Sequence, residues 1–474
     1  MAAKPICVDL DGTLVRTDTL MEGLLALLRL RPLHLLLLPW WLLRGRAHLK
    51  AQVAARAGLD CACLPYDEAV LDYLRARRAE GRELVLATGS DRANAEAVAN
   101  HLGLFDLVLA SDGVANLTGR RKADALGQRF GAGGYVYAGN SLKDLPVWRG
   151  ASQAIVVNAP GRVARRVRSL GLEHQIMGQP PAVGLGCLLK ALRAHQWVKN
   201  ILVLVPVMAA HRLDEPALLA RSGLALALFI LASAGVYLFN DLMDLEADRR
   251  SGDKCRRPLA CGDMPLAWGL TLFPALMLAA PLLAAWWLPG PLAWWLLAYL
   301  AANLAYSLWL KTRPLVDVLL LAGLYNLRIL AGGAAAGVEV SPWLQSLAGF
   351  VFLSLVLAKR YVELDQGFAA GGGPRRRGYQ AEDRLFLLVV GLVSGNLAVL
   401  VFSLYLTSET AMSLYRHPHL LWAVCPLLLY WINRVWLLAS RGRLHEDPVQ
   451  FALRDPVGYL VAGLTLAVMI GASL

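Results

Sequence analysis

The sequence is poor in charged residues and in cysteine. Asp, Glu, Lys and Arg make up 17% of the 474 residues, whereas 57% are hydrophobic and the mean hydropathy is +0.47. This composition is too apolar for an ordinary soluble protein, and the length suggests two or more domains. The seven cysteines are scattered, and the close pair Cys61 and Cys63 is not a C-x-x-C, so neither a disulfide framework nor a zinc site is indicated. We therefore expect a protein that lies partly in a lipid bilayer.

Acidic residues are also few. The chain has 35 Asp and Glu and 47 Lys and Arg, which gives a formal charge of +12. The basic residues adjoin apolar runs rather than exposed aromatic residues. This pattern favours anionic lipid headgroups and phosphorylated substrates, and no nucleic-acid partner is expected. The N-terminus lacks the apolar core and cleavage site of a signal peptide, so we expect the first domain to stay in the cytoplasm.

Residues 1–178 alternate strand-like and helical segments, which predicts an α/β domain with a parallel sheet covered by helices on both faces. In such a sheet, active residues gather at the carboxyl ends of the strands. The expected strands are Pro5 to Asp9, Glu83 to Ala87, Leu107 to Ala110, Tyr135 to Ala138 and Ala154 to Val157. Polar clusters stand at the carboxyl ends of several of them.

Four polar motifs stand in this domain: Asp9-Leu-Asp11-Gly-Thr13, Thr88-Gly-Ser90, Lys122 before a helix, and Gly139-Asn140-Ser-Leu-Lys-Asp144. Together they resemble the motifs of haloacid dehalogenase-like phosphatases, which have a Rossmann-like α/β fold. The resemblance implies that Asp9 attacks phosphorus and that Asp11 acts as general acid and base. It further implies that Thr88 and Lys122 bind the phosphoryl group and that Asp9, Asp11, Asn140 and Asp144 form a Mg²⁺ site.

Asn140 departs from this pattern, because the family usually has aspartate there. An amide oxygen is a neutral, weaker Mg²⁺ ligand than a carboxylate. The domain is then either a phosphatase of reduced activity or a module that binds phosphorylated ligands.

An apolar insertion at residues 20–50 interrupts the phosphatase-like segment. Its run from Leu33 to Leu43 contains Trp40 and Trp41 and is flanked by arginines, yet it is too short to span a bilayer. One reading is packing on the phosphatase core. The other is an interfacial cap with tryptophans at headgroup depth, which would bring lipid-borne substrates to Asp9.

The basic stretch from Gly161 to Pro181 is interpreted as a linker, after which residues 179–474 form a membrane domain. Its apolar runs predict an all-α domain of about nine transmembrane helices. These runs are Val198 to Ala210, Ala217 to Phe239, Leu266 to Leu288, Leu292 to Leu310, Leu315 to Ala336, Pro342 to Ala358, Leu385 to Leu406, Leu420 to Leu438 and Val457 to Ile470.

An acidic segment, Asn240-Asp241-Leu-Met-Asp244-Leu-Glu-Ala-Asp248, stands where the second run ends. On one continuous helix, Asn240, Asp244 and Asp248 would share a face with Asp241 beside them. Carboxylates so close need a cation, and oxygen ligands suit Mg²⁺ that holds substrate phosphates. The segment resembles the first aspartate-rich motif of the UbiA superfamily of intramembrane prenyltransferases, which implies nine helices, a polyprenyl substrate and a Mg²⁺-bound diphosphate.

Lysine and arginine concentrate in the loops after the second, fourth, sixth and eighth runs. This bias predicts a multi-pass protein of the inner (cytoplasmic) membrane, with the acidic segment and the phosphatase-like domain on the cytoplasmic side. The loop residues are Arg249, Arg250, Lys254, Arg256 and Arg257; Lys311 and Arg313; Lys359, Arg360 and Arg375 to Arg377; and Arg441 and Arg443.

Further polar residues stand near the same membrane boundary, where ionisable groups usually mark function, although lysines there can also snorkel to headgroups. The motifs H-Q-W-V-K-N, Y-S-x-x-L-K-x-x-P-L-x-D, L-A-K-R-x-x-E-L and E-D-P-V-x-F-A-L-R-D resemble the branch of decaprenyl-phosphate phosphoribosyltransferase. Asp317 has no second aspartate at the spacing found in aromatic prenyltransferases. The substrate-binding residues that this resemblance implies are Gln196, Lys199, Tyr306, Lys311, Asp317, Arg328, Lys359 and Arg360.

These resemblances imply a bifunctional enzyme. The membrane half would transfer 5-phosphoribosyl from phosphoribosyl diphosphate to a polyprenyl phosphate, and the first half would remove the 5-phosphate. Prenyl transfer to an aromatic or other acceptor, with an inactive or unrelated phosphatase domain, stays open as the alternative. A transporter is disfavoured because the acids cluster at one rim rather than at broken helices in the midplane. A homo-oligomer is compatible with the sequence.

Overall fold

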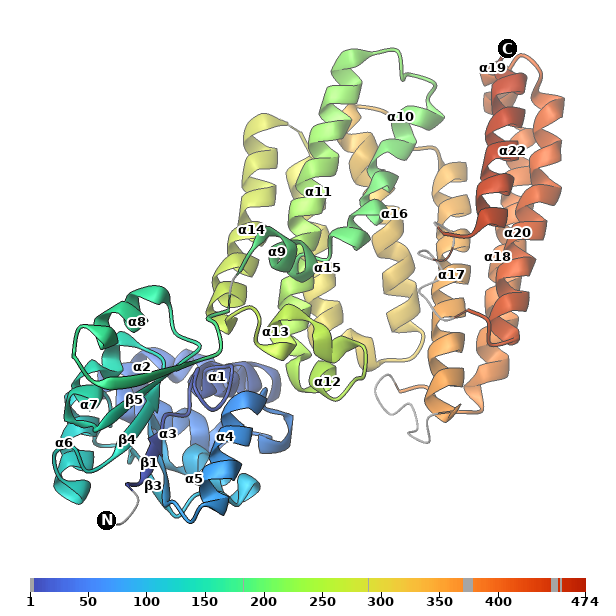
Figure 1. The fold of residues 1–474 in the computed structure, drawn as a ribbon. Coiled ribbons are helices and arrows are strands. Elements are labelled where there is room, and N and C mark those ends of the chain that lie inside the picture. Colours follow the sequence, from blue (N-terminus) through green and yellow to red (C-terminus); the bar gives the residue numbers. More distant parts are fainter. Residues whose placement is uncertain (1–3, 182, 289, 370–377, 445–450, 452–453) are drawn as a thin grey trace. The chain divides into compact units, whose positions relative to one another are not determined.

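The computed structural model describes residues 4–474 except 182, 289, 370–377, 445–450 and 452–453 (Figure 1). The chain forms two compact units, and each is described by itself. Unit 1 comprises Met1–Ala194 and Tyr237–Pro274, and unit 2 comprises His195–Val236 and Ala275–Leu474. Helices α11 (Pro216–Met243) and α14 (Leu266–Trp287) therefore contribute residues to both units.

A six-stranded, fully parallel sheet forms the centre of unit 1, with strand order β3-β2-β1-β4-β5-β6. The predicted α/β architecture with a parallel sheet is therefore confirmed. The strands are β1 (Ile6–Val8), β2 (Leu84–Asp91), β3 (Leu107–Ser111), β4 (Val136–Gly139), β5 (Gln153–Val157) and β6 (Glu173–Met177).

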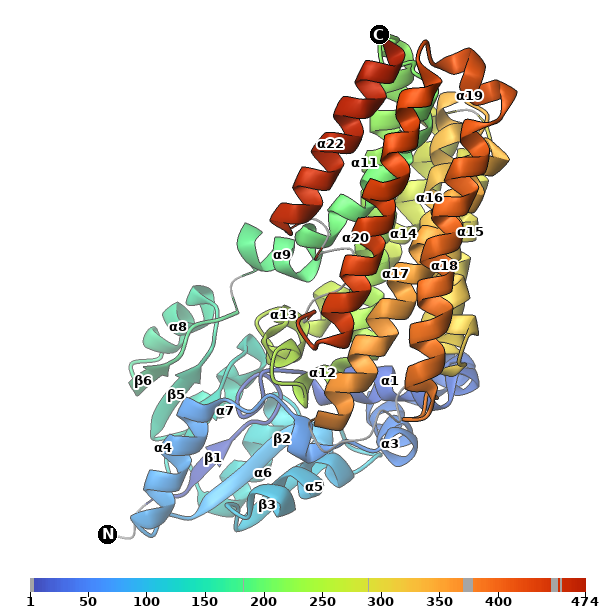
Figure 2. The same cartoon turned by 90° about the vertical axis from the view of Figure 1, so that its right-hand side faces the viewer.

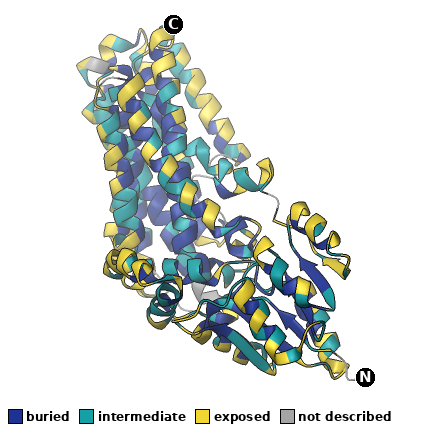
Figure 3. Cartoon of the chain, turned by 90° about the vertical axis from the view of Figure 1, so that its left-hand side faces the viewer, coloured by how far each residue is buried: buried dark blue, intermediate teal, exposed yellow. Residues whose placement is uncertain are grey.

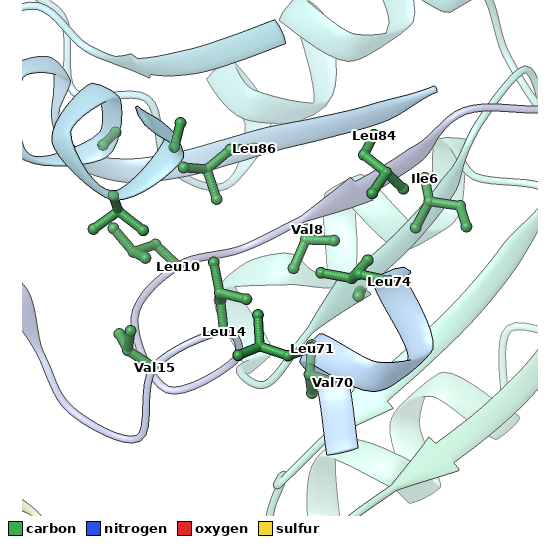
Figure 4. Close-up of a cluster of buried hydrophobic side chains, with 14 of the residues drawn as sticks. Ile6, Val8, Leu10, Leu14, Val15, Val70, Leu71, Leu74, Leu84 and Leu86 are labelled. Atoms are coloured by element: carbon green, nitrogen blue, oxygen red, sulfur yellow. The ribbon is translucent and has the colours of Figure 1, made fainter. Parts of the chain in front are cut away.

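Both faces of this sheet are buried, which explains why its central strands are continuous apolar runs. Ile6 and Val8 face a cluster with Leu71 and Leu74 of α4 (Figure 4). Cys7 belongs to the opposite cluster. Figure 3 shows strands of this sheet in the colour of buried residues. The alternation follows from the two-residue period of a strand. Helices α4 (Glu68–Ala79) and α5 (Arg92–Leu102) contribute to the first cluster, and α6 (Arg120–Phe130), α7 (Leu145–Gly150) and α8 (Gly161–Arg168) to the second.

The expectation of a linker from Gly161 to Pro181 is wrong for most of that stretch. Helix α8 packs Val163 and Val167 under the sheet, and β6 pairs with β5. Strand β6 is an edge strand whose first four residues are exposed, so it lacks the apolar signal of the buried strands. The phosphatase-like fold therefore continues to Met177.

The 20–50 insertion folds as helices packed on one another. Trp41 is buried with Leu27 and Val53 in a small core of its own, whereas Trp40 is 56% exposed. Only one of the two tryptophans is thus available to a headgroup layer. The elements are α1 (Thr19–Leu30), the 3₁₀ helix η1 (Pro32–Leu37), α2 (Leu38–Leu43) and α3 (Arg46–Ala57), followed by η2 (Cys61–Cys63).

The acidic segment is not one continuous helix. Helix α11 ends at Met243, and Asp244, with φ −100° and ψ 10°, caps the separate helix α12 (Leu245–Arg249). The expectation of one continuous helix is therefore corrected, whereas the common face of Asn240, Asp244 and Asp248 stays a prediction, because backbone bonds from Asp244 N–H to Asn240 O and from Asp248 N–H to Asp244 O span the break. Unit 1 also includes α9 (Leu185–Ala191), η5 (Lys254–Arg256) and α13 (Pro258–Cys261).

The helices of unit 2 form an all-α bundle, in which α16, α17, α18 and α20 pack side by side (Figure 2). Their contact is apolar, with Trp436, Val356 and Leu387 among its buried residues. The elements are η4 (Ala194–Leu204), α10 (Val205–Ala209), α15 (Leu292–Leu308), η6 (Leu310–Thr312), α16 (Val316–Ala336), α17 (Pro342–Ala369), α18 (Asp383–Leu406), α19 (Glu409–Leu414), η7 (Pro418–Ala423), α20 (Val424–Ser440) and α22 (Pro456–Ser473).

Among the described residues, six helices are long and apolar enough to cross a membrane, so the expected nine are not confirmed. The first expected run is divided between η4 and the five-residue α10, which begins beside Pro206. Helix α15 has 17 residues, which is short for a span. The six are Pro216–Met243, Leu266–Trp287, Val316–Ala336, Asp383–Leu406, Pro418–Ser440 and Pro456–Ser473.

Candidate functional sites

The first candidate site lies at the carboxyl end of the sheet in unit 1. Asp9 directly follows β1, and its Oδ1 accepts hydrogen bonds from Leu10 N–H at 2.9 Å and from Lys122 Nζ at 3.0 Å. Burial raises the pKa of Asp9 to about 6, Lys122 opposes this shift, and Asp144 and Asp11 add to it. A buried carboxylate with one cation beside it suits a nucleophile that attacks an anionic phosphate.

Asp11 lies in the same turn and is held by different partners. Its Oδ1 accepts from Thr19 N–H at 2.8 Å, and its Oδ2 accepts from the Ser90 hydroxyl. Burial raises the pKa of Asp11, and Asp18 adds to this shift. A raised pKa favours the protonated carboxyl, which is the form a general acid needs. Thr88 is fully buried in β2 and accepts from Ser90 N–H at 3.0 Å, so β2 supplies both residues of the second motif.

Lys122 is the cation of this site, with 3% of its side chain exposed. Its Nζ lies 3.0 Å from Asp9 Oδ1 and 3.7 Å from Asp144 Oδ1, and it donates to the Tyr137 hydroxyl at 2.8 Å. Burial lowers the pKa of Lys122, but Asp9 and Asp144 outweigh it and raise the pKa overall. The sequence analysis missed Tyr137, although the alternation of β4 could have placed its side chain with Cys7 below the sheet.

The fourth motif contacts the first motif at Gly12 through Asn140. Gly12 has φ +71°, and a Cβ there would lie 2.0 Å from Asn140 Nδ2, so only glycine fits this turn. Asp144 Oδ2 accepts from Ser141 N–H and from the Ser141 hydroxyl, each at 3.0 Å, and Oδ1 accepts from Tyr137 at 3.0 Å. Asp144 therefore orients neighbouring groups of the site.

The donors that remain for a metal are oxygen atoms of Asp9, Asp11 and Asn140. An all-oxygen donor set fits Mg²⁺ in kind, and Asn140 lowers its negative charge. Both described contacts of the Asp9 carboxylate fall on Oδ1, which leaves Oδ2 on the other side of the group. Asp144 is already bonded through both oxygens and would support such a site through its neighbours.

Lys50, on helix α3 of the 20–50 insertion, reaches the same region and was not identified from sequence. Its Nζ donates to Gly89 O at 2.6 Å and to Asn116 Oδ1 at 3.2 Å. Burial lowers the pKa of Lys50, while Asp11 and Asp18 oppose this shift. No local motif marks this lysine, because the fold of the insertion brings it to the second motif.

The second candidate site in unit 1 is the acidic segment, where Asp241 and Asp248 are buried. The Arg257 guanidinium lies 3.0 Å from Asp241 Oδ1 and 2.5 Å from Asp248 Oδ2, and Arg193 also donates to Asp241 Oδ1. Burial raises the pKa of Asp248, Arg257 opposes this shift, and Asp241 adds to it. Arg193 and Arg257, neither of which was expected to belong to this site, thus offset the negative charge of Asp241 and Asp248.

The acids of this segment are oxygen donors of the type that Mg²⁺ prefers. In the part of the chain that the structure describes, no three Asp, Glu, His or Cys side chains converge as a metal-binding group. The fit to Mg²⁺ therefore rests on the donor chemistry of Asn240, Asp241, Asp244 and Asp248.

In unit 2, Asp317 and Arg360 form a buried ion pair near the start of α16. Arg360 Nε lies 2.6 Å from Asp317 Oδ2, and its other nitrogens donate to the Tyr306 hydroxyl at 2.9 Å and to Glu363 at 2.6 Å. Tyr379 donates to Asp317 Oδ1 at 2.7 Å. The structure thus brings together three of the expected substrate-binding residues.

Leu315, two residues before Asp317, has φ +65°, an uncommon conformation for a residue with a branched side chain. Its N–H donates to the Tyr379 hydroxyl at 2.9 Å, so Tyr379 bonds both Leu315 and Asp317. Strained backbone of this kind persists only where the surroundings fix it, and it often marks a functional site.

Arg328 belongs to a separate buried cluster in unit 2. It donates to Asn200 Oδ1 at 3.0 Å, to Leu324 O at 2.7 Å and to the Tyr299 hydroxyl at 2.9 Å. These bonds join three segments of the bundle, which gives Arg328 a structural role. Its expected part in substrate binding stays a prediction.

The remaining expected substrate-binding residues, Gln196, Lys199, Lys311 and Lys359, are half-buried. Lys199 and Gln196 lie in η4, with Lys199 Nζ 6.0 Å from the centre of the Tyr325 ring. Lys311 lies in η6 and Lys359 in α17. Arg375 to Arg377 and most of the motif from Glu446 to Asp455 lie outside the described residues, although Asp455 itself pairs with Arg434 at 2.5 Å.

The fold and these sites define a membrane transferase domain preceded by a hydrolase-type α/β domain. Residues 201–454 match the UbiA prenyltransferase family, and residues 6–149 match haloacid dehalogenase-like hydrolases. The chain belongs to the UbiA family and carries a fused haloacid dehalogenase-like domain. This assignment confirms both family resemblances and indicates an enzyme with several membrane-spanning helices.

Three similar proteins illustrate the relationship. The uncharacterized protein y4nM of Sinorhizobium fredii is 36% identical over 97% of this chain and 89% of its own length. Decaprenyl-phosphate phosphoribosyltransferase of Mycobacterium tuberculosis strain H37Rv is 31% identical over 61% of this chain and 95% of its own length. A UbiA homologue from Archaeoglobus fulgidus, solved with DMAPP and Mg²⁺, is 19% identical over 60% of this chain and 98% of that chain, with a TM-score of 0.45.

Proposed function

We propose that the chain performs two consecutive reactions on a polyprenyl lipid. Residues 179–474 transfer 5-phosphoribosyl from phosphoribosyl diphosphate to a polyprenyl phosphate, and residues 1–178 then remove the 5-phosphate. The observation that carries this proposal is the phosphatase-type set of Asp9, Asp11 and Lys122 in one chain with a UbiA domain. The similarity to the mycobacterial phosphoribosyltransferase supports the choice of substrates.

In the transfer step, a phosphate oxygen of the lipid attacks C1 of the ribose, and the C1–O bond to the diphosphate breaks. The leaving diphosphate takes the electron pair, and its negative charge must be stabilised. Asn240, Asp241, Asp244 and Asp248 would hold Mg²⁺, which supplies charge stabilisation to the diphosphate when bound. The side chains proposed to bind the substrates are Gln196, Lys199, Tyr306, Lys311, Asp317, Arg328, Lys359 and Arg360.

In the hydrolytic step, Asp9 attacks the phosphorus of the 5-phosphate and the P–O bond to the ribose breaks. Asp11 donates its proton to the departing O5, and Lys122 and Thr88 hold the phosphoryl oxygens. Water then attacks the aspartyl-phosphate, Asp11 accepts its proton, and inorganic phosphate leaves. Asp9, Asp11 and Asn140, supported by Asp144, would hold a Mg²⁺ that offsets the phosphate charge.

The 20–50 insertion is proposed to bring the hydrolytic site to the headgroup layer of the inner membrane, on its cytoplasmic side. It exposes Leu33, Leu36 and Leu43 by 77%, 77% and 82%, and Arg44 stacks on the exposed Trp40 ring at 5.0 Å. Apolar side chains with neighbouring arginines are typical of segments that lie in an anionic membrane surface.

The proposal is tested by incubating the purified protein with polyprenyl phosphate, Mg²⁺ and labelled phosphoribosyl diphosphate. Wild type should give the dephosphorylated ribosyl lipid, as identified by mass. Asp9→Asn should accumulate the phosphorylated lipid, and Asp241→Ala should give neither product. Identical products from wild type and Asp9→Asn would refute the second step.

Competition binding between geranylgeranyl diphosphate and phosphoribosyl diphosphate, with analysis of the product formed from each, tests the first step. Tighter binding of geranylgeranyl diphosphate than of phosphoribosyl diphosphate, together with a prenylated aromatic product, would refute phosphoribosyl transfer and support prenyl transfer.

A further inference from the structure

The two candidate sites of unit 1 are joined by a buried ion pair that neither proposed reaction uses. Arg249, the last residue of α12, donates to both carboxylate oxygens of Glu22 on α1, at 2.6 and 3.2 Å. The side chains are 7% and 6% exposed, and Arg249 Nε also donates to Ala260 O at 2.9 Å. Removing either partner would leave a buried, uncompensated charge, so this pair strongly favours one arrangement of the two segments.

Further ion pairs flank this contact, and both segments contribute charges of both signs. Arg29 of α1 pairs with Glu246 at 2.5 Å, and Arg16 lies 3.4 Å from Asp263. These side chains are about one-third exposed or more, so each pair stabilises the contact only weakly. Together with Glu22 and Arg249, these charges alternate in sign and define one register between residues 16–29 and residues 245–263, because a shift would bring like charges together.

A close backbone contact also belongs to this interface. Gly262 has φ +82°, and a Cβ at this position would lie 2.5 Å from the carbonyl oxygen of Arg16. Both the conformation and the space therefore require glycine. Residues 16–29 and 245–263 are thus held together by a close backbone contact as well as by ion pairs.

Helix α1 continues from this interface to the general acid. Thr19, which opens α1, donates its N–H to Asp11 Oδ1 at 2.8 Å, and Thr17 donates its hydroxyl to Glu22 Oε1 at 2.6 Å. On the other segment, Arg249 directly follows Asp248 of the acidic segment. A chain of hydrogen bonds and one helical turn therefore connects Asp11 with Asp248.

We propose that Glu22 and Arg249 form a latch by which the phosphatase-like domain docks on residues 245–263, and that the latch positions Asp11 through Thr19. The occupant of this docking surface is the segment of the same chain that follows the acidic motif. Docking does not depend on either activity, whereas the positioning of Asp11 rests on the proposed phosphatase activity. Glu22 and Arg249 are therefore positioning residues.

Cross-linking tests the docking without reference to activity. Arg250 Nε lies 3.0 Å from Cys63 Sγ, so Arg250→Cys places two thiols across the interface. A protease site inserted after Gln179 in this full-length variant allows the two halves to be separated after treatment with a short bismaleimide. We expect the halves to stay covalently joined after cleavage, and to separate when Cys63→Ser is added.

The latch itself is tested by reversing its charges in the Arg250→Cys protein. Glu22→Arg should reduce the cross-linked fraction at least about tenfold, which corresponds to about 1.4 kcal/mol, and adding Arg249→Glu should restore it. Equal cross-linking with and without Glu22→Arg would refute the latch. Absence of cross-linking in the parent variant would refute the docking.

Hydrolysis of a soluble phosphate monoester tests the positioning of Asp11. Arg249→Ala should lower kcat about tenfold with KM unchanged, and the charge-reversed pair Glu22→Arg/Arg249→Glu should recover most of it. Arg78→Ala, which breaks the exposed pair between Arg78 of α4 and Asp106, is the matched control and should leave kcat unchanged.

Two outcomes of this assay have different meanings. Equal kcat in Arg249→Ala and wild type would refute the positioning role. A wild-type protein that hydrolyses no monoester would refute the proposed phosphatase function and with it the positioning role, while the cross-linking result would still decide the docking.

Discussion

Replacing Asp317 by alanine separates a structural from a substrate-binding role of the buried pair in unit 2. Asp317 is fully buried, and the Arg360 side chain is 2% exposed. Removing one partner of a buried ion pair costs about 3–5 kcal/mol, because the remaining charge is left uncompensated. Arg360 keeps Glu363 at 2.6 Å, a partner that is 38% exposed, so we expect a loss near the lower limit, about 3 kcal/mol.

The double variant Asp317→Ala/Arg360→Met removes both charges and should recover most of this loss. The assay is urea-induced unfolding in detergent, followed by tryptophan fluorescence, with phosphoribosyl transfer measured on the same samples. If Asp317 and Arg360 bind substrate, the double variant should be stable but inactive. A loss below about 1 kcal/mol in Asp317→Ala, the range of an exposed pair, would refute the burial argument. Full transfer activity in the double variant would refute the substrate-binding role.

Three further predictions concern separate parts of the chain. Asn140→Asp should strengthen Mg²⁺ binding by the phosphatase-like domain and lower the Mg²⁺ concentration for half-maximal hydrolysis, because it adds a charged oxygen ligand. Gly391→Ala should destabilise unit 2 by about 1–3 kcal/mol in urea unfolding, since its Cβ would lie 2.0 Å from the Trp436 ring. Leu36→Glu should slow dephosphorylation of the lipid product but leave hydrolysis of a soluble monoester unchanged, because it weakens only the proposed contact with headgroups.

The sequence was sufficient for the phosphatase-like site because parallel strands end at one edge of the sheet. Asp9 directly follows β1 and Thr88 lies in the neighbouring strand β2, so strand prediction alone places the two motifs close together, and Asp11 accepts a hydrogen bond from Ser90 of β2. Lys50 could not be found in this way, because its position depends on how the 20–50 insertion folds back over β2.

The errors have local physical causes. Strand β6 was taken for part of a linker because an exposed edge strand needs no apolar alternation. The acidic segment was expected to continue α11, but the helix ends before Asp244 and restarts at Leu245. Arg193 reaches Asp241 across 48 positions of sequence, a separation at which no helical or strand periodicity relates two residues.

The charge balance around Asp241 and Asp248 bears on what this site can bind. Asp241 and Asp248 pair with two arginines, and Asp244 adds a further negative charge that helps to raise the pKa of Asp248, so a divalent cation alone would meet competing guanidinium groups. A cation that arrives with a diphosphate brings anionic oxygens to which Arg193 and Arg257 can transfer their hydrogen bonds. Both arginine side chains are 20–25% exposed, whereas the acids are 4–5% exposed, so the arginines are the partners with room to move. This balance supports a diphosphate substrate over a free metal ion as the species that the acidic segment recognises.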